Sequence, residues 1–207
     1  GISTNALDID TNATGIATNT TAIAALTCGL SIGDFAEGGI IFYLDPSGCH
    51  GLVAKAIDEP PGLYPFSTTN FFTYANASGI YGGAQNTKKI IHFTLLNGST
   101  CPAASHCDDL IFDGYSDWYL PSIDELDMMY VNLYLNGLGN FSGLRYWSST
   151  EPDAEVLTLF VELGSRITKN TAHAYFQWFN HANSGLIIWL ESSKYDGRFS
   201  LRAIRAF

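Results

Sequence analysis

The chain has 207 residues, of which 46% are hydrophobic and 14% aromatic, so it can fill a real core and is not disordered. Its formal net charge is -10, which argues against nucleic acid as the main partner. There is no signal peptide and no apolar run long enough to span a bilayer, so we expect no direct insertion into a membrane.

The first 30 residues carry a heptad repeat. An apolar residue recurs at every seventh position, and three residues after each of the first four comes Asn5, Asn12, Asn19 or Leu26. This spacing predicts that residues 1–30 form a parallel, three-stranded coiled-coil stalk of a homotrimer. The predicted trimer core consists of Ile9, Asn12, Ile16, Asn19, Ile23 and Leu26. The alternative interpretation is a flexible linker rich in Thr and Asn.

Two phrases of the stalk, IDTNAT and IATNTT, resemble the stalks of trimeric autotransporter adhesins. In those stalks, Asn side chains at the d position point inward and hold an anion on the trimer axis. The resemblance implies that Asn12 and Asn19 point toward the axis and could bind an anion such as chloride.

The four cysteines are even in number and lack the CxxC spacing typical of a zinc site. We interpret them as two disulfides. One joins Cys101 to Cys107 and closes a proline-containing surface loop, CPAASHC, and the other joins Cys28 to Cys49. The alternative is four reduced, buried thiols in a cytoplasmic protein.

The heptad pattern stops at Ser31, and a globular head is expected over residues 31–207. The stretches GIIFYL and GLVA, separated by a turn at 45–48, predict a β-hairpin. A long loop over 58–80 follows, and then a helix that ends at Asn97-Gly98.

A second helix is predicted in LPSIDELDMMYVNLYL, where Ser122 and Glu125 form a capping box. The sequence then becomes rich in strands, and the core is expected near Trp118 and Trp147. Helices followed by a meander of strands predict an α+β head. The expected strands are RYWSST, VLTLFVELG, HAYFQWF, GLIIWLE and FSLRAIRAF.

No catalytic constellation is recognisable, so we expect a binding protein rather than an enzyme. Ser116 and Asp117 lack a nucleophile elbow and an evident His partner. The stretch CDDLIFDGYSD places four carboxylates within ten positions, which could bind calcium, although a solvated acidic loop is the favoured interpretation. The five His residues are scattered and predict no metal site.

Four phrases of the head carry a resemblance: GGIIFYLDPSGCHGLVA, GYSDWYLPSIDEL, YWSSTE and RAIRAF. Together they resemble the domain family named for the C-terminal region of the Legionella collagen-like adhesin (Lcl). The resemblance implies a head of the C-type-lectin-like or sulfatase-modifying-factor-like group. It also implies a trimeric adhesin on the bacterial cell surface, outside the cell and associated with the outer membrane. Such an adhesin follows a collagen-like region, binds sulfated glycosaminoglycans, and supports host attachment and biofilm. The cysteine pair of the formylglycine-generating enzymes is missing after Cys107, so that activity does not carry over.

Sulfate groups are bound by Arg and Lys side chains, and seven of the ten in this chain follow Leu144. A homotrimer would present each basic loop three times and so gain avidity. Arg202 and Arg205 alternate with apolar residues and are expected to pair with carboxylates of the head. The glycan-binding candidates are Arg166, Lys169, Lys194, Arg198, Lys88 and Lys89. The alternative function is a phage tail-fibre tip that binds a bacterial receptor.

Overall fold

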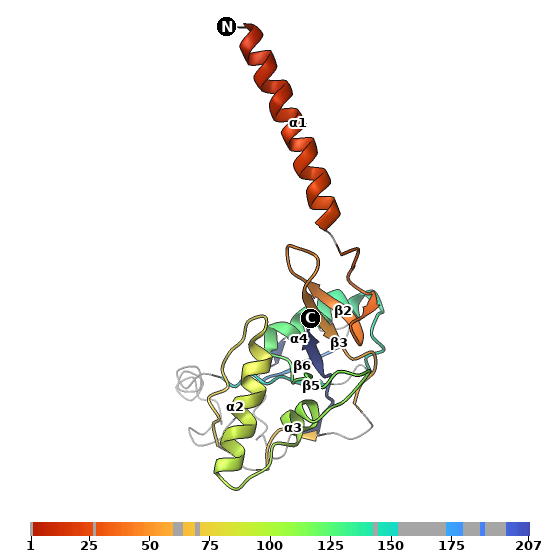
Figure 1. The fold of residues 1–207 in the computed structure, drawn as a ribbon. Coiled ribbons are helices and arrows are strands. Elements are labelled where there is room, and N and C mark those ends of the chain that lie inside the picture. The colour runs from red at the N-terminus through yellow and green to blue at the C-terminus, as the bar shows by residue number, and fades with distance from the viewer. Residues whose placement is uncertain are drawn as a thin grey trace.

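The protein consists of a long N-terminal helix and a globular head, as the computed structural model shows (Figure 1). Residues 28–59 and 71–142 make up most of the described head. The structure describes residues 2–26, 28–59, 64–68, 71–142, 145–152, 173–179, 187–188 and 198–207.

The N-terminal helix α1 spans Ile2–Leu26 and extends away from the head (Figure 1). Its threonines and asparagines are poor helix formers, so their intrinsic propensity contributes little to its stability. Thr14 and Thr18 each donate a side-chain hydrogen bond to the carbonyl four residues earlier, at 2.9 Å in both cases. The described side chains of α1 are exposed, and Ile9 and Ile16 are exposed by 67% and 66%. Most helices in proteins gain their stability from packing an apolar face rather than from propensity, and the described apolar side chains of α1 are exposed in the single chain.

The helix ends four residues before the predicted end of the stalk. Leu30, which continues the heptad spacing, is not helical and packs partly buried against the core of the head. The side chains of Ile23 and Leu26 lie outside the described part of the chain. The apolar side chain of Leu30 therefore belongs with the head, and the repeat of α1 stops at Leu26.

The predicted hairpin is confirmed and forms the centre of a four-stranded antiparallel sheet with the order β1-β2-β3-β9. A register shift between Ile41 and Tyr43 marks a bulge in the hairpin. The last strand of the chain, β9, pairs with β3 and lies at the edge of the sheet opposite to β1. The strands are β1 (Phe35–Ala36), β2 (Gly39–Leu44), β3 (Gly51–Ala54) and β9 (Ile204–Ala206).

Both predicted helices of the head are present as α2 (Gly82–Leu96) and α4 (Ile123–Asn132). The capping box of α4 is confirmed, because Ser122 Oγ accepts from the Glu125 amide and the Glu125 carboxylate accepts from the Ser122 amide. A short 3₁₀ turn, η1 (Tyr134–Asn136), follows α4. The head therefore combines helices and strands in an α+β domain, as the sequence predicts.

The remaining strands are short and antiparallel in their pairings. The strands β4 and β8 pair with each other, and β5, β6 and β7 form a three-stranded sheet. The predicted strand VLTLFVELG lies outside the described residues. These five strands are β4 (Tyr64–Pro65), β5 (Arg145–Trp147), β6 (Phe176–Trp178), β7 (Ile187–Ile188) and β8 (Arg198–Phe199).

The core contains two clusters of apolar side chains. Trp118 and Trp147 belong to the first cluster and are 1% and 0% exposed, which confirms their predicted place in the core. Trp147 also donates its Nε1 hydrogen to the Tyr64 carbonyl at 2.7 Å. The second cluster packs α4 against β2 and β3 through Leu126, Met129 and other apolar residues.

The expectation of two disulfides is half right. Cys28 and Cys49 form a disulfide, but Cys101 and Cys107 are free and buried. The stretch CPAASHC, predicted as a surface loop, is the helix α3 (Pro102–Asp108) with Cys101 as its N-cap. Because a helix rises about 1.5 Å per residue, positions six apart lie about 9 Å apart, beyond the reach of a disulfide. Cys101 Sγ instead accepts a hydrogen bond from Thr94 Oγ1 at 3.0 Å.

Candidate ligand-binding surface

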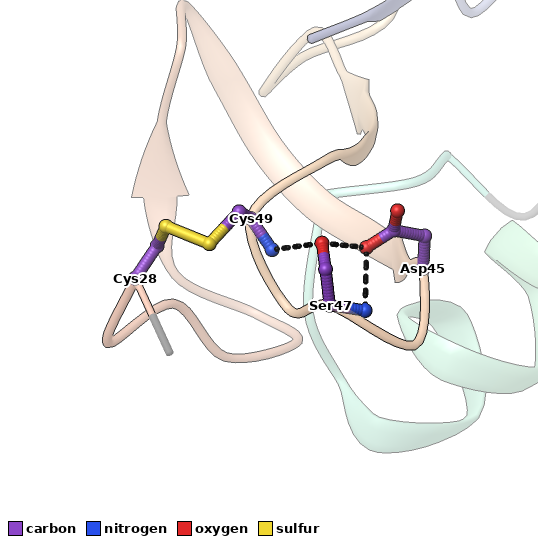
Figure 2. The surroundings of a disulfide bond; sticks show 4 residues. All are labelled: Cys28, Asp45, Ser47 and Cys49. Atoms are coloured by element: carbon purple, nitrogen blue, oxygen red, sulfur yellow. Dashed lines mark hydrogen bonds between the residues drawn. A yellow bond between two sulfur atoms is a disulfide. The ribbon is translucent and has the colours of Figure 1, made fainter. Parts of the chain in front are cut away.

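The disulfide fixes the segment after α1 to the turn between β2 and β3 (Figure 2). In this turn, Asp45 accepts hydrogen bonds from both the amide and the hydroxyl of Ser47, and Ser47 Oγ accepts from the Cys49 amide at 3.2 Å. The hydrogen bond from the Ser47 hydroxyl is the main reason why the pKa of Asp45 is lowered. The turn is therefore ordered at the point where the disulfide attaches.

Arg202 is fully buried and is held by acceptors from two segments, one after β3 and one after η1. Its Nε donates to Asp58 Oδ1 at 2.9 Å, and its Nη1 donates to the carbonyls of Lys55 and Gly139 at 2.8 and 2.6 Å. Its guanidinium carbon also lies 4.0 Å from the centroid of the Phe141 ring. Arg202 is thus a structural residue, as predicted, and it does not reach a ligand.

Arg205 is buried as well and binds the Asp117 carboxylate with two parallel hydrogen bonds, at 2.7 and 3.1 Å. It also donates to the Glu37 carbonyl at 2.9 Å and stacks on the Tyr115 ring at 3.8 Å. This confirms the expected structural role of Arg205. The same contact gives Asp117 a structural role, because it holds the last strand to the segment before Trp118.

A third cation, Lys55, is buried and paired with the buried Glu59 at 3.0 Å. His106 Nε2 lies 2.9 Å from the same Glu59 oxygen, and the His106 ring packs against Tyr64. Burial raises the pKa of the neighbouring Cys107 thiol well above its usual value, and the Glu59 carboxylate adds to this effect. The thiol is therefore protonated at neutral pH and is a poor nucleophile.

Two buried carboxylates stabilise the loop before α2. Glu151 accepts hydrogen bonds from the amide and hydroxyl of Thr73 and from the Tyr74 amide. Glu125 accepts from the Tyr81 amide at 2.8 Å in addition to its capping box. Burial is the main reason why the pKa of Glu125 is raised. Both acids hold backbone in place and are not presented to solvent.

Arg145 is an exposed cation placed on an aromatic surface, and sequence reasoning missed it. Its guanidinium carbon lies 5.1 Å from the ring centroid of Trp178, 5.7 Å from that of Phe176 and 5.8 Å from that of Phe199. Trp178 is half-buried, so part of this indole shares the surface with Arg145. Alternation along the strand gives no signal for it, because Arg145 and Trp147 are two positions apart and yet the burial pattern of Arg145-Tyr146-Trp147 is exposed, buried, buried.

Lys88 and Lys89 lie next to each other on α2, away from the residues that cap it. Lys88 is exposed, whereas Lys89 is half-buried and donates from Nζ to the Tyr74 carbonyl at 3.3 Å. Tyr74 in turn contacts the Phe93 ring edge-on. Lys88 is therefore the more accessible of the two predicted ligand-binding lysines.

Four further residues are predicted to bind the glycan. Arg166, Lys169 and Lys194 lie outside the described residues. Arg198 begins β8, and its backbone lies opposite Pro65. Its side chain also lies outside the described part of the chain. The Ser200 amide donates to the Arg145 carbonyl at 2.9 Å. Arg198 is two residues before Ser200, so its backbone lies near that of Arg145.

The acidic stretch proposed for calcium does not form a compact cluster. Asp117 is engaged by Arg205, and Asp108 and Asp109 are exposed at the end of α3. Asp113 is exposed in a tight turn with a φ of 49°. Across the part of the chain that the structure describes, no group of three or more His, Cys, Asp or Glu residues could hold a metal ion.

This arrangement separates the cations into two groups. Lys55, Arg202 and Arg205 are neutralised inside the head, whereas Arg145 and Lys88 face solvent. A guanidinium held over aromatic rings loses less freedom when it binds a sulfate or carboxylate with two hydrogen bonds. The face of β5 and β6 can therefore bind an anionic ligand that also offers an apolar face to Trp178.

Comparison with protein-family models and with curated proteins finds no match to this chain. Among the described helices, none combines the length and the apolar character needed to cross a membrane.

Proposed function

We propose that this chain is the stalk and head of a homotrimeric adhesin on the bacterial cell surface, which binds sulfated glycosaminoglycans and supports host attachment and biofilm. The head would have a C-type-lectin-like fold, in line with the resemblance to the Lcl C-terminal domain family. The face around Arg145, together with Lys88, Lys89 and the basic loops after Leu144, would contact the glycan. Catalysis plays no part in this proposal.

The observation that carries the proposal is the exposure of the heptad isoleucines on α1. Ile9 and Ile16 lie seven residues apart and are two-thirds exposed in the single chain. Burying an isoleucine stabilises a protein by about 1.5–3 kcal/mol, which favours association of parallel copies through this face. With three copies, every cation of the head is presented three times on one assembly.

The placement of the cations supports an anionic ligand despite the net charge of -10. Part of that negative charge is neutralised, because the carboxylates of Asp58, Glu59 and Asp117 are each paired with a cation of the head. Arg145 has no carboxylate partner among its described contacts, which are with aromatic rings. Its charge is therefore available to a ligand.

The disulfide between Cys28 and Cys49 favours the adhesin over the phage tail-fibre tip. Tail fibres assemble in the reducing cytoplasm, where disulfides rarely persist, whereas exported proteins keep them. The two interpretations share a trimeric stalk and a receptor-binding head. They differ in the ligand, because a fibre tip would bind a bacterial receptor rather than a sulfated glycosaminoglycan.

Heparin binding by the intact chain tests the proposal. Two variants carry the test: Arg145→Ala, and a fourfold variant with Arg166, Lys169, Lys194 and Arg198 replaced by Glu. We expect Arg145→Ala to weaken binding about tenfold, because charge-assisted hydrogen bonds are worth about 1.5–3 kcal/mol. Arg145→Lys should recover binding only in part, since an ammonium cannot make the two-pronged contact.

The matched control is Ser116→Glu, which also changes the net charge by one unit at an exposed position outside this face. It should leave binding nearly unchanged, and each variant is first shown by light scattering to be a trimer. Binding should weaken steeply as salt is added. A trimer that does not bind heparin, or binds it equally at low and high salt, would contradict the proposed ligand.

A further inference from the structure

Five exposed apolar side chains lie on the segment after the stalk and on the stretch from the end of α4 to just after η1, and we call them the neck surface. The exposed fractions of Phe35, Val131, Leu135, Ile32 and Leu138 are 60%, 47%, 45%, 41% and 39%. Isolated exposed apolar residues are ordinary, but a contiguous group of them marks an interaction surface.

The two segments of the neck surface are in contact. A Cβ atom added to Gly33, between Ile32 and Phe35, would come within 2.9 Å of Leu138 Cδ1. Val131 and Leu135 are four residues apart at the end of α4 and in η1, and therefore lie near each other. Asn132 Nδ2 donates to the Phe42 carbonyl at 2.9 Å and so fixes this end of α4 to β2. The neck surface thus rests on ordered elements.

The neck surface lies close to the stalk. The chain from Leu26 to Ile32 can span at most about 20 Å, even if fully extended. The disulfide between Cys28 and Cys49 restrains this segment further by tying it to the turn before β3. Figure 1 shows that α1 leaves the head at the end where β1 and β2 lie. Helices packed in a coiled coil have axes about 8–10 Å apart, so three copies joined through α1 bring three neck surfaces together.

We infer that the neck surface is an interface with a second copy of this chain, in which the apolar side chains of neighbouring heads pack around the axis of the stalk. This inference rests on the proposed trimer and deepens it. Burial of apolar side chains holds the heads together against the repulsion between chains that each carry a net charge of -10. It also fixes the orientation of the heads, and with it the spacing of the three glycan-binding faces.

Cross-linking of variants that each carry one added cysteine tests the inference on the full chain. Phe35→Cys and Leu135→Cys each place a reactive thiol on the neck surface. The natural cysteines do not interfere, because Cys28 and Cys49 are bonded and Cys101 and Cys107 are buried. A short bismaleimide should join neighbouring copies of both variants, since proximity raises the effective thiol concentration to the millimolar range.

The matched control is Leu95→Cys, at the end of α2 far from the stalk (Figure 1). Leu95 is 70% exposed, so its thiol is at least as accessible as those of the test variants. We expect covalent product at least about tenfold above this control for both neck variants. A trimer by light scattering with no product above the control overturns the neck interface and leaves the proposed trimer intact. A monomer overturns the proposed trimer itself, and the neck interface with it.

Discussion

The buried guanidinium of Arg202 donates to the Asp58 carboxylate at 2.9 Å and joins two residues 144 positions apart in the chain. Tyr146 donates its hydroxyl hydrogen to the other Asp58 oxygen at 2.7 Å. The Asp58 carboxylate thus connects the segment after β3, the strand β5 and the segment before β9. This contact holds these three segments together.

Replacement of Arg202 by Ala should destabilise the head by about 3–5 kcal/mol, because it leaves the Asp58 carboxylate without its cation. Urea unfolding followed by tryptophan fluorescence measures this loss. Asp58→Asn with Arg202→Met should cost less than Arg202→Ala alone, since the pair is removed together. Equal stability of wild type and Arg202→Ala would show that the contact is not structural.

Titration of the thiols should find two per chain without reductant, and only after denaturation. Cys101 and Cys107 are buried, and burial raises the pKa of Cys107, so the native protein should react slowly with a thiol reagent at neutral pH. Denatured protein that offers no thiol would indicate a bond between Cys101 and Cys107. Four thiols would rule out the bond between Cys28 and Cys49.

The stability of the head should depend on pH through Glu125. Its pKa is raised in the folded state, so its stabilising contribution is complete below the unfolded pKa and is lost as pH rises through the folded value. Glu125→Gln keeps the size of the side chain and an oxygen acceptor for the capping box. The free energy of unfolding of wild type, minus that of this variant, should fall between pH 4 and pH 7, and a rise would contradict the assignment.

If α1 forms the proposed trimer, its stability should respond to chloride through Asn12 and Asn19. Replacing both with Ile should raise the midpoint of thermal unfolding of the helix, because buried Asn layers cost stability. The midpoint of the wild-type chain should rise with chloride at constant ionic strength, while that of the variant should not. Circular dichroism of the full chain measures both midpoints. If chloride raises the midpoints of wild type and variant by the same amount, the anion does not bind at Asn12 and Asn19.

Local signals in the sequence were sufficient for most elements of the head. The hairpin of β2 and β3, the end of α2 before Asn97-Gly98 and the capping box at Ser122 were all predicted, because each depends on residues a few positions apart. The structure of the stretch CPAASHC was predicted wrongly, because it depends on contacts with residues far away in the sequence. Its cysteines suggested a closed loop, whereas the packing of Ala103 and Ala104 into the core makes it a helix.

The sequence by itself determined the heptad of α1, the α+β composition of the head and the inward role of Arg202 and Arg205, since periodicity and alternation are local properties. Only the tertiary structure decided that Leu30 packs on the head and that Arg145 lies exposed over Trp178. It also brought Gly33 beside Leu138 and so assembled the neck surface. These contacts join segments far apart in the chain, and no local pattern encodes such distances.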